Sequence, residues 1–183
     1  MRRIAVAVIA ALACGVDPAL ALPRGTDDFA LGWTRPAVDS AVAARGVDVI
    51  SSGRGFLTCR SADPNVELES YDFFVGPHGR SHLWRVIVAY PLPYSVEMLA
   101  SVESRLREIL GEPTQESLED DQIFRPNRFR KLIWVDGRTR VQLGGRMLGA
   151  DANAGERMLV SWTDRRIQRL IESKRKRERE SRR

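Results

Sequence analysis

The chain has 183 residues, of which 43% are hydrophobic and 29% are charged. This length predicts one domain, or two small similar units that share a core, and this composition excludes a chain that is disordered throughout. The formal net charge is +5, but residues 172–183 alone hold seven basic and three acidic residues. The body of the chain is therefore close to neutral, and its charge gives no argument for a basic face on the folded domain.

The first 21 residues have the pattern of a secretory signal. MRR supplies a positive start, an apolar run of ten residues follows at 4–13, and residues 19–21, ALA, form a small-x-small cleavage site. A run of that length is too short to span a bilayer. We therefore expect cleavage after Ala21 and a periplasmic or secreted protein. A second route stays open, in which Cys14, directly behind small residues, carries a lipid anchor.

Cleavage removes Cys14 and lipidation blocks it, so either route leaves Cys59 as the only free cysteine. We therefore expect no intramolecular disulfide. Its context, GFLTCRS, predicts a small apolar residue of a strand. An intermolecular bridge or a reactive thiol is the alternative.

A short helix is predicted over about 35–45. Val38 and Val42 lie four residues apart and give it a narrow apolar stripe. Its ends carry residues that helix ends favour: Thr34 as N-cap, Pro36 in the first turn and Gly46 after the last turn.

Four segments rich in β-branched and aromatic residues follow, and we expect strands at 47–50, 55–59, 65–75 and 81–90. In the last of them, alternation places one set of side chains on a common face: Trp84, Val86, Val88 and Tyr90.

In the third of these strands, Leu68 is out of phase with Tyr71. We therefore expect a β-bulge near Ser70.

The second helix begins after Ser95 and ends at Gly111. Its apolar side chains keep helical spacing, at Met98, Leu99, Val102, Leu106, Ile109 and Leu110. The polar stretch 112–130 that comes next contains ESLEDD and RPNRFRK and is predicted to be a long exposed connection.

Asp136-Gly137 predicts a tight β-hairpin between residues 131–135 and 138–148. With a two-residue loop, Val135 pairs with Arg138, and Leu132 lies across from Val141 on the core face.

A further strand is expected at 157–163. Asp164 can cap a final helix, at about 164–171, which docks through Ile167, Leu170 and Ile171. The charged tail, 172–183, comes last.

Together these elements predict an α+β domain over 22–171, with an antiparallel sheet and helices packed on one face. The order of a helix followed by strands occurs twice, which suggests two tandem halves at about 29–90 and 95–163.

The candidates for catalysis are few. His78 and His82 lie in or beside one hairpin turn, and a metal site would need further ligands from elsewhere in the chain. ESLEDD offers carboxylates for a divalent ion but also suits a solvated loop. DANAGE (151–156) begins like a calcium loop but lacks the closing glutamate, so a hairpin turn is preferred. We assign no catalytic, cofactor-binding or metal-binding residue.

Two groups of side chains are candidates for binding. Tryptophans often belong to a core but also stack on ligands, so Trp33, Trp84 and Trp134 are possible contacts. In the tail, the basic block Lys174, Arg175, Lys176 and Arg177 could meet anionic lipid heads or envelope polymers, but glutamates spaced among these residues also suit a solvated helix end.

Gly32-Trp33-Thr34 followed by Val38 resembles the Gly-Met-Thr-x-x-x-Val helix start of small bacterial envelope proteins, the outer-membrane-assembly lipoproteins and the β-lactamase-inhibitor-protein-like fold. The resemblance implies single or tandem units of a helix plus antiparallel sheet that act by protein contact without catalysis. This chain departs from the pattern where Trp33 replaces Met. LGEP occurs at 110–113, behind the second helix, instead of after the first.

These observations predict an exported, noncatalytic binding or scaffolding module of the cell envelope. Its partner is expected to be a protein or an envelope component, with no cofactor and no nucleic acid. Two alternatives remain: a small metal-dependent or hydrolytic periplasmic enzyme that uses His78 and His82, and an anionic-surface binder that acts through the tail.

Overall fold

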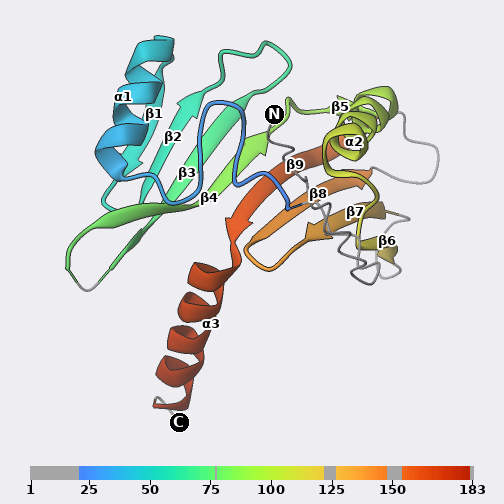
Figure 1. Cartoon of the computed structure of the whole chain (residues 1–183). Coiled ribbons are helices and arrows are strands. Elements are labelled where there is room, and N and C mark those ends of the chain that lie inside the picture. Colours follow the sequence, from blue (N-terminus) through green and yellow to red (C-terminus); the bar gives the residue numbers. More distant parts are fainter. Residues whose placement is uncertain (1–20, 77, 122–126, 148–153, 182–183) are drawn as a thin grey trace, which may run out of the picture.

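The computed structural model describes residues 21–76, 78–121, 127–147 and 154–181. They form a nine-stranded antiparallel sheet and three helices, of which the third extends away from the end of the sheet (Figure 1). The predicted α+β class is confirmed.

The elements follow in the order α1 (Arg35–Arg45), β1 (Val49–Gly53), β2 (Phe56–Arg60), β3 (Leu68–Val75), β4 (Ser81–Ala89), β5 (Tyr94–Ser95), α2 (Val96–Leu110), β6 (Gln115–Asp121), β7 (Asn127–Val135), β8 (Thr139–Met147), β9 (Ala154–Asp164) and α3 (Arg165–Glu180).

The strands lie side by side in the order β1-β2-β3-β4-β9-β8-β7-β6, and the short β5 pairs with β9. Strand β4, the last long strand before α2, therefore pairs with β9, the last strand after α2. We call this junction the β4–β9 seam. A division of the chain into two similar halves stays a prediction.

Helices α1 and α2 cover the same face of the sheet. Val86 of β4 packs in the cluster under α1, and Val88, two residues further along, packs against the cluster under α2. Because residues two apart in a strand point to one face, the two clusters lie on one side of the sheet. Trp162 of β9 contacts both clusters and so joins them.

The helix ends follow the predicted pattern except at Thr34, which stands at the N-cap of α1 but makes no side-chain capping bond. Gly46 ends α1 in the left-handed region, at φ 64°, which favours glycine. The Ser95 hydroxyl caps α2 by accepting from the amide of Met98 at 3.1 Å. Asp164 caps α3 by accepting from the amides of Arg166 and Ile167.

Strand β3 has no bulge near Ser70, so that prediction is wrong. Glu69, Tyr71 and Phe73 alternate without interruption on the buried face. When only apolar residues are placed on the buried face, Glu69 is assigned to the exposed face. Leu68 and Tyr71 then fall on opposite faces, which led to the prediction of a bulge.

The bulge lies one strand further on, in β4. Asp72 of β3 pairs with Arg85, and the next residue, Phe73, pairs with Leu83, so Trp84 is the extra residue. Leu83 is fully buried in the position that alternation from Val86 assigns to Trp84. The prediction that Trp84 shares a face with Val86 is therefore wrong.

The predicted exposed connection at 112–130 is wrong for residues 115–121 and 127–130, which form strands, while residues 122–126 lie outside the described ranges. Strand β6 pairs with β7 in register from Gln115↔Ile133 to Asp121↔Asn127. Its charged residues are those of an edge strand, where one row of backbone groups has no neighbouring strand.

The β7–β8 hairpin forms, but with a register two residues away from the predicted one. Val135 pairs with Arg140, because the Asp136 carboxylate caps the turn by accepting from the amides of Arg138 at 2.7 Å and Thr139 at 2.5 Å. A shift of two residues keeps each side chain on its predicted face.

Helix α3 extends nine residues beyond the predicted end at 171 and buries none of its residues. Leu170 is 49% exposed, so its predicted docking is wrong. In the described residues, no helix is long and apolar enough to cross a membrane.

Candidate functional site

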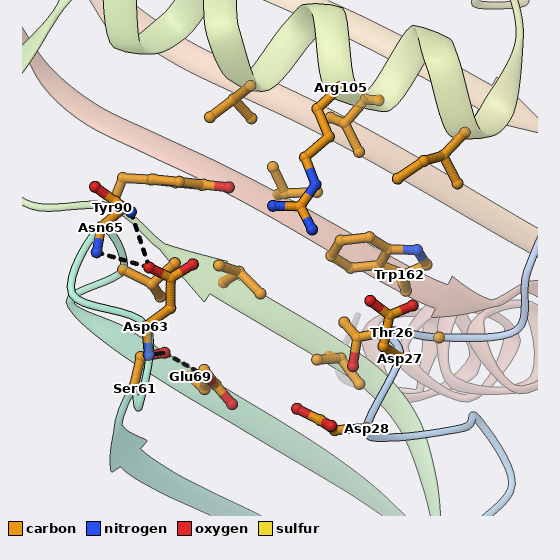
Figure 2. Close-up of a pocket in the computed structure, with 18 of the residues that line it drawn as sticks. Thr26, Asp27, Asp28, Ser61, Asp63, Asn65, Glu69, Tyr90, Arg105 and Trp162 are labelled. Carbon is orange, nitrogen blue, oxygen red and sulfur yellow. Dashed lines mark hydrogen bonds between the residues drawn. The ribbon is translucent and has the colours of Figure 1, made fainter.

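A groove of about 730 Å³ lies over the β4–β9 seam (Figure 2). Its floor comes from the two central strands, with Val86 and Val88 from β4 and Val160 and Trp162 from β9. Because α1 and α2 each cover their own cluster, the strip of sheet between them stays open. The volume falls within the range of small-molecule and cofactor sites.

Helix α2 forms one wall. Met98 and Val102 line the groove from this helix, and Ile109 lines it while 58% of its surface stays exposed. The apolar stripe of α2 is therefore wider than the part that the sheet buries. Arg105 reaches from the same helix over the floor, between Tyr90 and Trp162 (Figure 2).

The opposite wall carries exposed carboxylates. Asp27 and Asp28 come from the segment before α1, and Asp63 comes from the β2–β3 loop. Asp63 accepts from the backbone and side-chain nitrogens of Asn65, at 2.8 and 3.0 Å, which fixes this loop. This wall is acidic, and it faces the cationic Arg105.

A buried polar cluster lies at the base of the acidic wall. Glu69 accepts from both terminal nitrogens of Arg45 at 2.7 Å, from the Ser61 hydroxyl at 2.6 Å and from the Tyr71 hydroxyl. The two bonds from Arg45 form a bidentate pair, the strongest geometry for this kind of contact.

Each titratable group of this cluster is held in one state. Burial raises the pKa of the Glu69 carboxyl, but hydrogen bonds from Arg45, Ser61 and Tyr71 lower it by more, so the net shift is downward. Burial, and next the bond to Glu69, raise the pKa of Tyr71 well above its usual range. Glu69 therefore stays ionised and Tyr71 stays protonated, with the oxygens of Glu69 occupied by donors.

Cys59 is buried in β2 close to this cluster. Burial, and next the charge of Glu69, raise the pKa of the thiol to about 11. A thiol that stays protonated is a poor nucleophile, so the residue packs as a small apolar side chain, as its sequence context predicts.

Trp162 brings one polar atom to the groove floor. Its indole N–H is buried and has no hydrogen-bond partner among the residues that the structure describes. Buried donors in folded proteins are usually paired, with protein or with ordered water.

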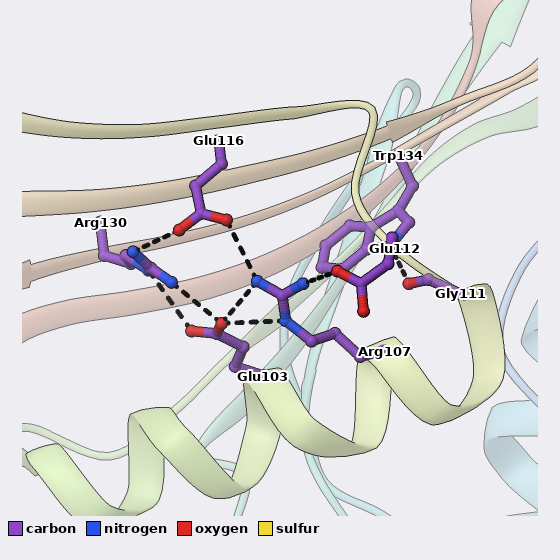
Figure 3. A network of polar contacts seen from close by, with 7 residues as sticks. All are labelled: Glu103, Arg107, Gly111, Glu112, Glu116, Arg130 and Trp134. Carbon is purple, nitrogen blue, oxygen red and sulfur yellow. Dashed lines mark hydrogen bonds and ion pairs between the residues drawn. The ribbon is translucent and has the colours of Figure 1, made fainter.

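A second polar cluster joins α2 to the edge of the sheet (Figure 3). Glu103 contacts Arg107 at 2.9 Å and Arg130 at 3.0 Å, and Glu116 contacts the same two arginines at 3.2 and 2.6 Å. Burial raises the pKa of Glu103, but bonds from Arg130 and Arg107 lower it by more. This network fixes α2 over β6 and β7 and so sets the position of one groove wall.

Trp134, predicted as a possible binding residue, is only 1% exposed. Its indole nitrogen donates to the carbonyl of Gly111 at 2.8 Å, at the end of α2 (Figure 3). It is a core residue that anchors the helix and offers no binding surface.

The other two predicted tryptophans are accessible but lie outside the groove. Trp33 is 38% exposed and contacts the edge of Phe29. Trp84 is half-buried under the guanidinium of Arg85, which lies 4.9 Å from its ring. They are not brought together with the groove residues.

The predicted basic block, residues 174–177, lies on the exposed surface of α3. Lys174 is 4.0 Å from Glu178, and Lys176 is 3.9 Å from Glu180. These two contacts along the helix offset part of the positive charge of Lys174 and Lys176.

The two histidines do not lie in the groove. His78 is exposed in the β3–β4 turn, and His82 lies in β4, where its Nδ1 is 3.2 Å from the carbonyl oxygen of Gly32. Within the described ranges, no group of three histidine, cysteine or carboxylate side chains could hold a metal ion. Residues 151–153 of DANAGE lie outside these ranges.

The groove could not be predicted from the sequence, because its residues come from parts of the chain far apart: 23–28, 45, 61–69, 86–90, 98–110 and 160–162. The alternation of Val86, Val88 and Tyr90 indicates a buried face and not an open one. The pairing of β4 with β9, which creates the site, has no signal in the sequence.

Three comparisons give no match: no protein-family model matches the chain, and no curated protein and no solved structure is significantly similar to it.

Proposed function

We propose that this protein is an exported, noncatalytic binding module of the bacterial cell envelope. The groove at the β4–β9 seam takes a segment of a partner protein that presents apolar side chains and at least one lysine or arginine. The observation that carries the proposal is the pairing of an apolar floor with an acidic wall in one open site.

The apolar part of the groove supports the choice of a protein segment. Val88, Val102 and Ile109 line it from two elements, and Ile109 is mostly exposed. Burying such surface is the main driving force of association, at about 25 cal/mol per Å² of apolar area.

The charges support a cationic residue in that segment. Asp27, Asp28 and Asp63 stand on one wall, and Arg105 is opposite. Arg45 binds Glu69 at 2.7 Å and lies 3.9 Å from Asp28, so its single charge is shared between two carboxylates. Complementary charges at the rim of an interface chiefly set the rate of association and the choice of partner.

The state of the buried cluster supports binding over bond-making. Glu69 accepts bonds from three residues and its pKa lies below the usual range, so it is unsuited to taking a proton at neutral pH. The helix start at Gly32-Trp33-Thr34 gives further support, because the envelope proteins that it resembles act by protein contact.

The proposal can be tested at two serines of α2. Ser101 lines the groove, whereas Ser104 is exposed on the same helix outside the lining. A photo-crosslinking amino acid at position 101, in the native host, should give an adduct with an envelope protein, and mass spectrometry of the adduct should identify the contacted segment.

A synthetic peptide with the sequence of that segment should then bind the purified protein and change the fluorescence of Trp162. Ser101→Trp, which fills the groove, should weaken binding at least about tenfold, which corresponds to 1.4 kcal/mol. Ser104→Trp should bind within about twofold of the unmodified protein. Equal crosslinking at 101 and 104, or equal binding by the two variants, would exclude the groove as the site.

A further inference from the structure

We propose that Asp136 is the binding site for the amino terminus of the processed protein: cleavage after Ala21 turns the nitrogen of Leu22 into an ammonium group, and the Asp136 carboxylate holds it. This inference rests on the proposed export of the chain, and it goes beyond the groove because it assigns the residue that binds the new amino terminus.

The contact that carries the inference links two parts of the chain 114 residues apart. The nitrogen of Leu22 donates to Oδ2 of Asp136 at 2.8 Å, in a partly buried position. In the structure this nitrogen is a peptide amide, and it stands for the ammonium nitrogen of the processed chain. The donor is therefore already within ion-pair distance of a carboxylate.

The two oxygens of Asp136 have separate tasks. Oδ1 accepts from the amides of Arg138 and Thr139 and so shapes the β7–β8 turn, while Oδ2 accepts from Leu22. Burial raises the pKa of Asp136, but the bonds from these three amides and the nearby Arg165 lower it by more. The carboxylate is thus ionised and available to a cation.

The residues that follow Leu22 are fixed in place. The Leu22 side chain packs against the core under α2, and Arg24 forms an ion pair with Asp164 at 2.7 Å. Asp164 repeats the division seen at Asp136, since Oδ1 caps α3 and Oδ2 binds Arg24. The folded domain therefore holds this segment from its first residue, directly behind the small-x-small motif at 19–21.

The chemical step is hydrolysis of the Ala21–Leu22 peptide bond by a leader peptidase that cleaves after small residues. Water supplies the hydroxyl of the new carboxylic acid on Ala21 and one proton to the nitrogen of Leu22. At neutral pH the acid then releases its proton to solvent and the amine takes up a proton from solvent, which leaves a carboxylate and an ammonium group. A single amide N–H becomes a charged group with three N–H donors. Before cleavage only the acceptor of its bond to Asp136 carries a charge, whereas after cleavage both donor and acceptor do, so the bond becomes an ion pair.

The groups that face the new charge are Asp136, Arg165 and the Arg24–Asp164 pair. Arg165 donates to the backbone carbonyl of Asp136, so its charge lies close to the same carboxylate. Asp164 is already neutralised by Arg24. Among the residues that the structure describes, Asp136 is the acidic group whose oxygen accepts from this nitrogen.

The first arm of the test uses the full chain, expressed in a bacterial host and recovered from the envelope. Intact mass and amino-terminal sequencing should show a chain that begins at Leu22. Retained Met1, a lipid on Cys14 or another starting residue would overturn the proposal.

The second arm separates the ion pair from the role of Asp136 in the turn. Asp136→Asn keeps an oxygen for the two turn amides, and Asn-Gly suits a tight hairpin. It places a nitrogen donor, without charge, opposite Leu22. The variant is compared with the parent in the processed chain and in the unprocessed chain, which is made in the cytoplasm with all 183 residues.

The turn is present in both forms of the chain, so the effect of Asp136→Asn on the turn lowers the stability of both forms equally and cancels in the comparison. Asp136→Asn should lower the midpoint of thermal unfolding by about 2–4 °C more in the processed chain than in the unprocessed one. The Leu22 amine should also have a higher pKa in the parent than in Asp136→Asn, because the carboxylate favours its charged form. Equal drops in the two forms would overturn the ion pair, and groove variants at Ser101 would be unaffected by that result.

Discussion

The two helices on the covered face of the sheet are held by ion pairs that differ in how many charges share the contact. Under α1, Arg45 and Glu69 form a buried bidentate pair, with side chains only 18% and 12% exposed, and the exposed Asp28 lies 3.9 Å from Arg45. Beside α2, Glu103 and Arg107 belong to a network that reaches solvent, where Glu116 is 43% exposed. A buried charge without its partner is costly, whereas a charge near water is easily solvated. The α1 side should therefore be the more fragile of the two.

The largest expected effect is that of Arg45→Met. It leaves Glu69 ionised and without its cation in a buried site, and the free energy of unfolding should fall by about 3–5 kcal/mol. Urea denaturation measures the loss. Arg60→Met, at an exposed position of β2, is the matched control and should change stability by less than about 0.5 kcal/mol.

The double variant Arg45→Met/Glu69→Leu sharpens this prediction. It removes both charges, and replacing a buried pair with apolar residues is often close to neutral, so more than half of the loss should be recovered. A double variant as unstable as the single one would show that the loss came from packing and not from the unpaired charge.

The α2 side should be more sensitive to packing than to charge. A Cβ added at Gly145 would lie 2.8 Å from the Tyr94 hydroxyl and 3.2 Å from Cδ1 of Leu99. Gly145→Ala should thus destabilise the protein by about 1–3 kcal/mol, because both neighbours are buried and cannot move away. Gly137→Ala, where the added Cβ meets no atom within 4 Å, is the control for thermal unfolding.

Acid should weaken both regions over the same range of pH. The pKa values of Glu69 and Glu103 are lowered from the ordinary 4.5 by folding, which means that the folded state favours their ionised forms. Their contribution to the free energy of unfolding is complete above the pKa of the unfolded state. It is lost as the pH falls through the pKa of the folded state. Each pKa unit corresponds to about 1.4 kcal/mol.

Denaturation midpoints measured from pH 7 to pH 3 should therefore stay constant at first and fall below about pH 4.5. The fall should be smaller in the Arg45→Met/Glu69→Leu variant, which lacks one of the two groups. A variant that loses stability as steeply as the parent would remove Glu69 from the explanation.

The smallest expected effect is that of Glu103→Gln. This change removes one charge from a network in which Glu116 still contacts both Arg107 and Arg130. A loss of at most about 1 kcal/mol is expected, and it should shrink further in high salt. A loss as large as that of Arg45→Met would contradict the distinction between the two regions.

Prediction from the sequence succeeded where the signal is local. The apolar spacing of α2, with Ser95 before it and Gly111 after it, located that helix, and alternating residues located β3 and β4. Prediction failed where a distant partner decides the outcome. The sequence of β6 resembles a polar connection. Its charged residue Glu116 pairs with Arg130 of β7, and no local pattern in the sequence links these two residues.

The candidate site shows the same division. The tryptophans were natural candidates because of their chemistry, yet Trp134 is buried, and Trp162, which was not chosen for binding, lies in the groove floor. The cluster around Glu69 was also missed, because a lone glutamate in a strand resembles a surface residue until its position beside Arg45 and Tyr71 is known.

Local patterns predict the fold class, the positions of α1 and α2, most of the strands and the turn at Asp136-Gly137, because each depends on side chains within a few residues of one another. Which strands meet, which glutamate is buried and where the sheet stays uncovered are known from the folded molecule alone. The pairing of β4 with β9 and the burial of Glu69 gain their free energy from contacts between distant segments, and the groove exists only where those segments meet.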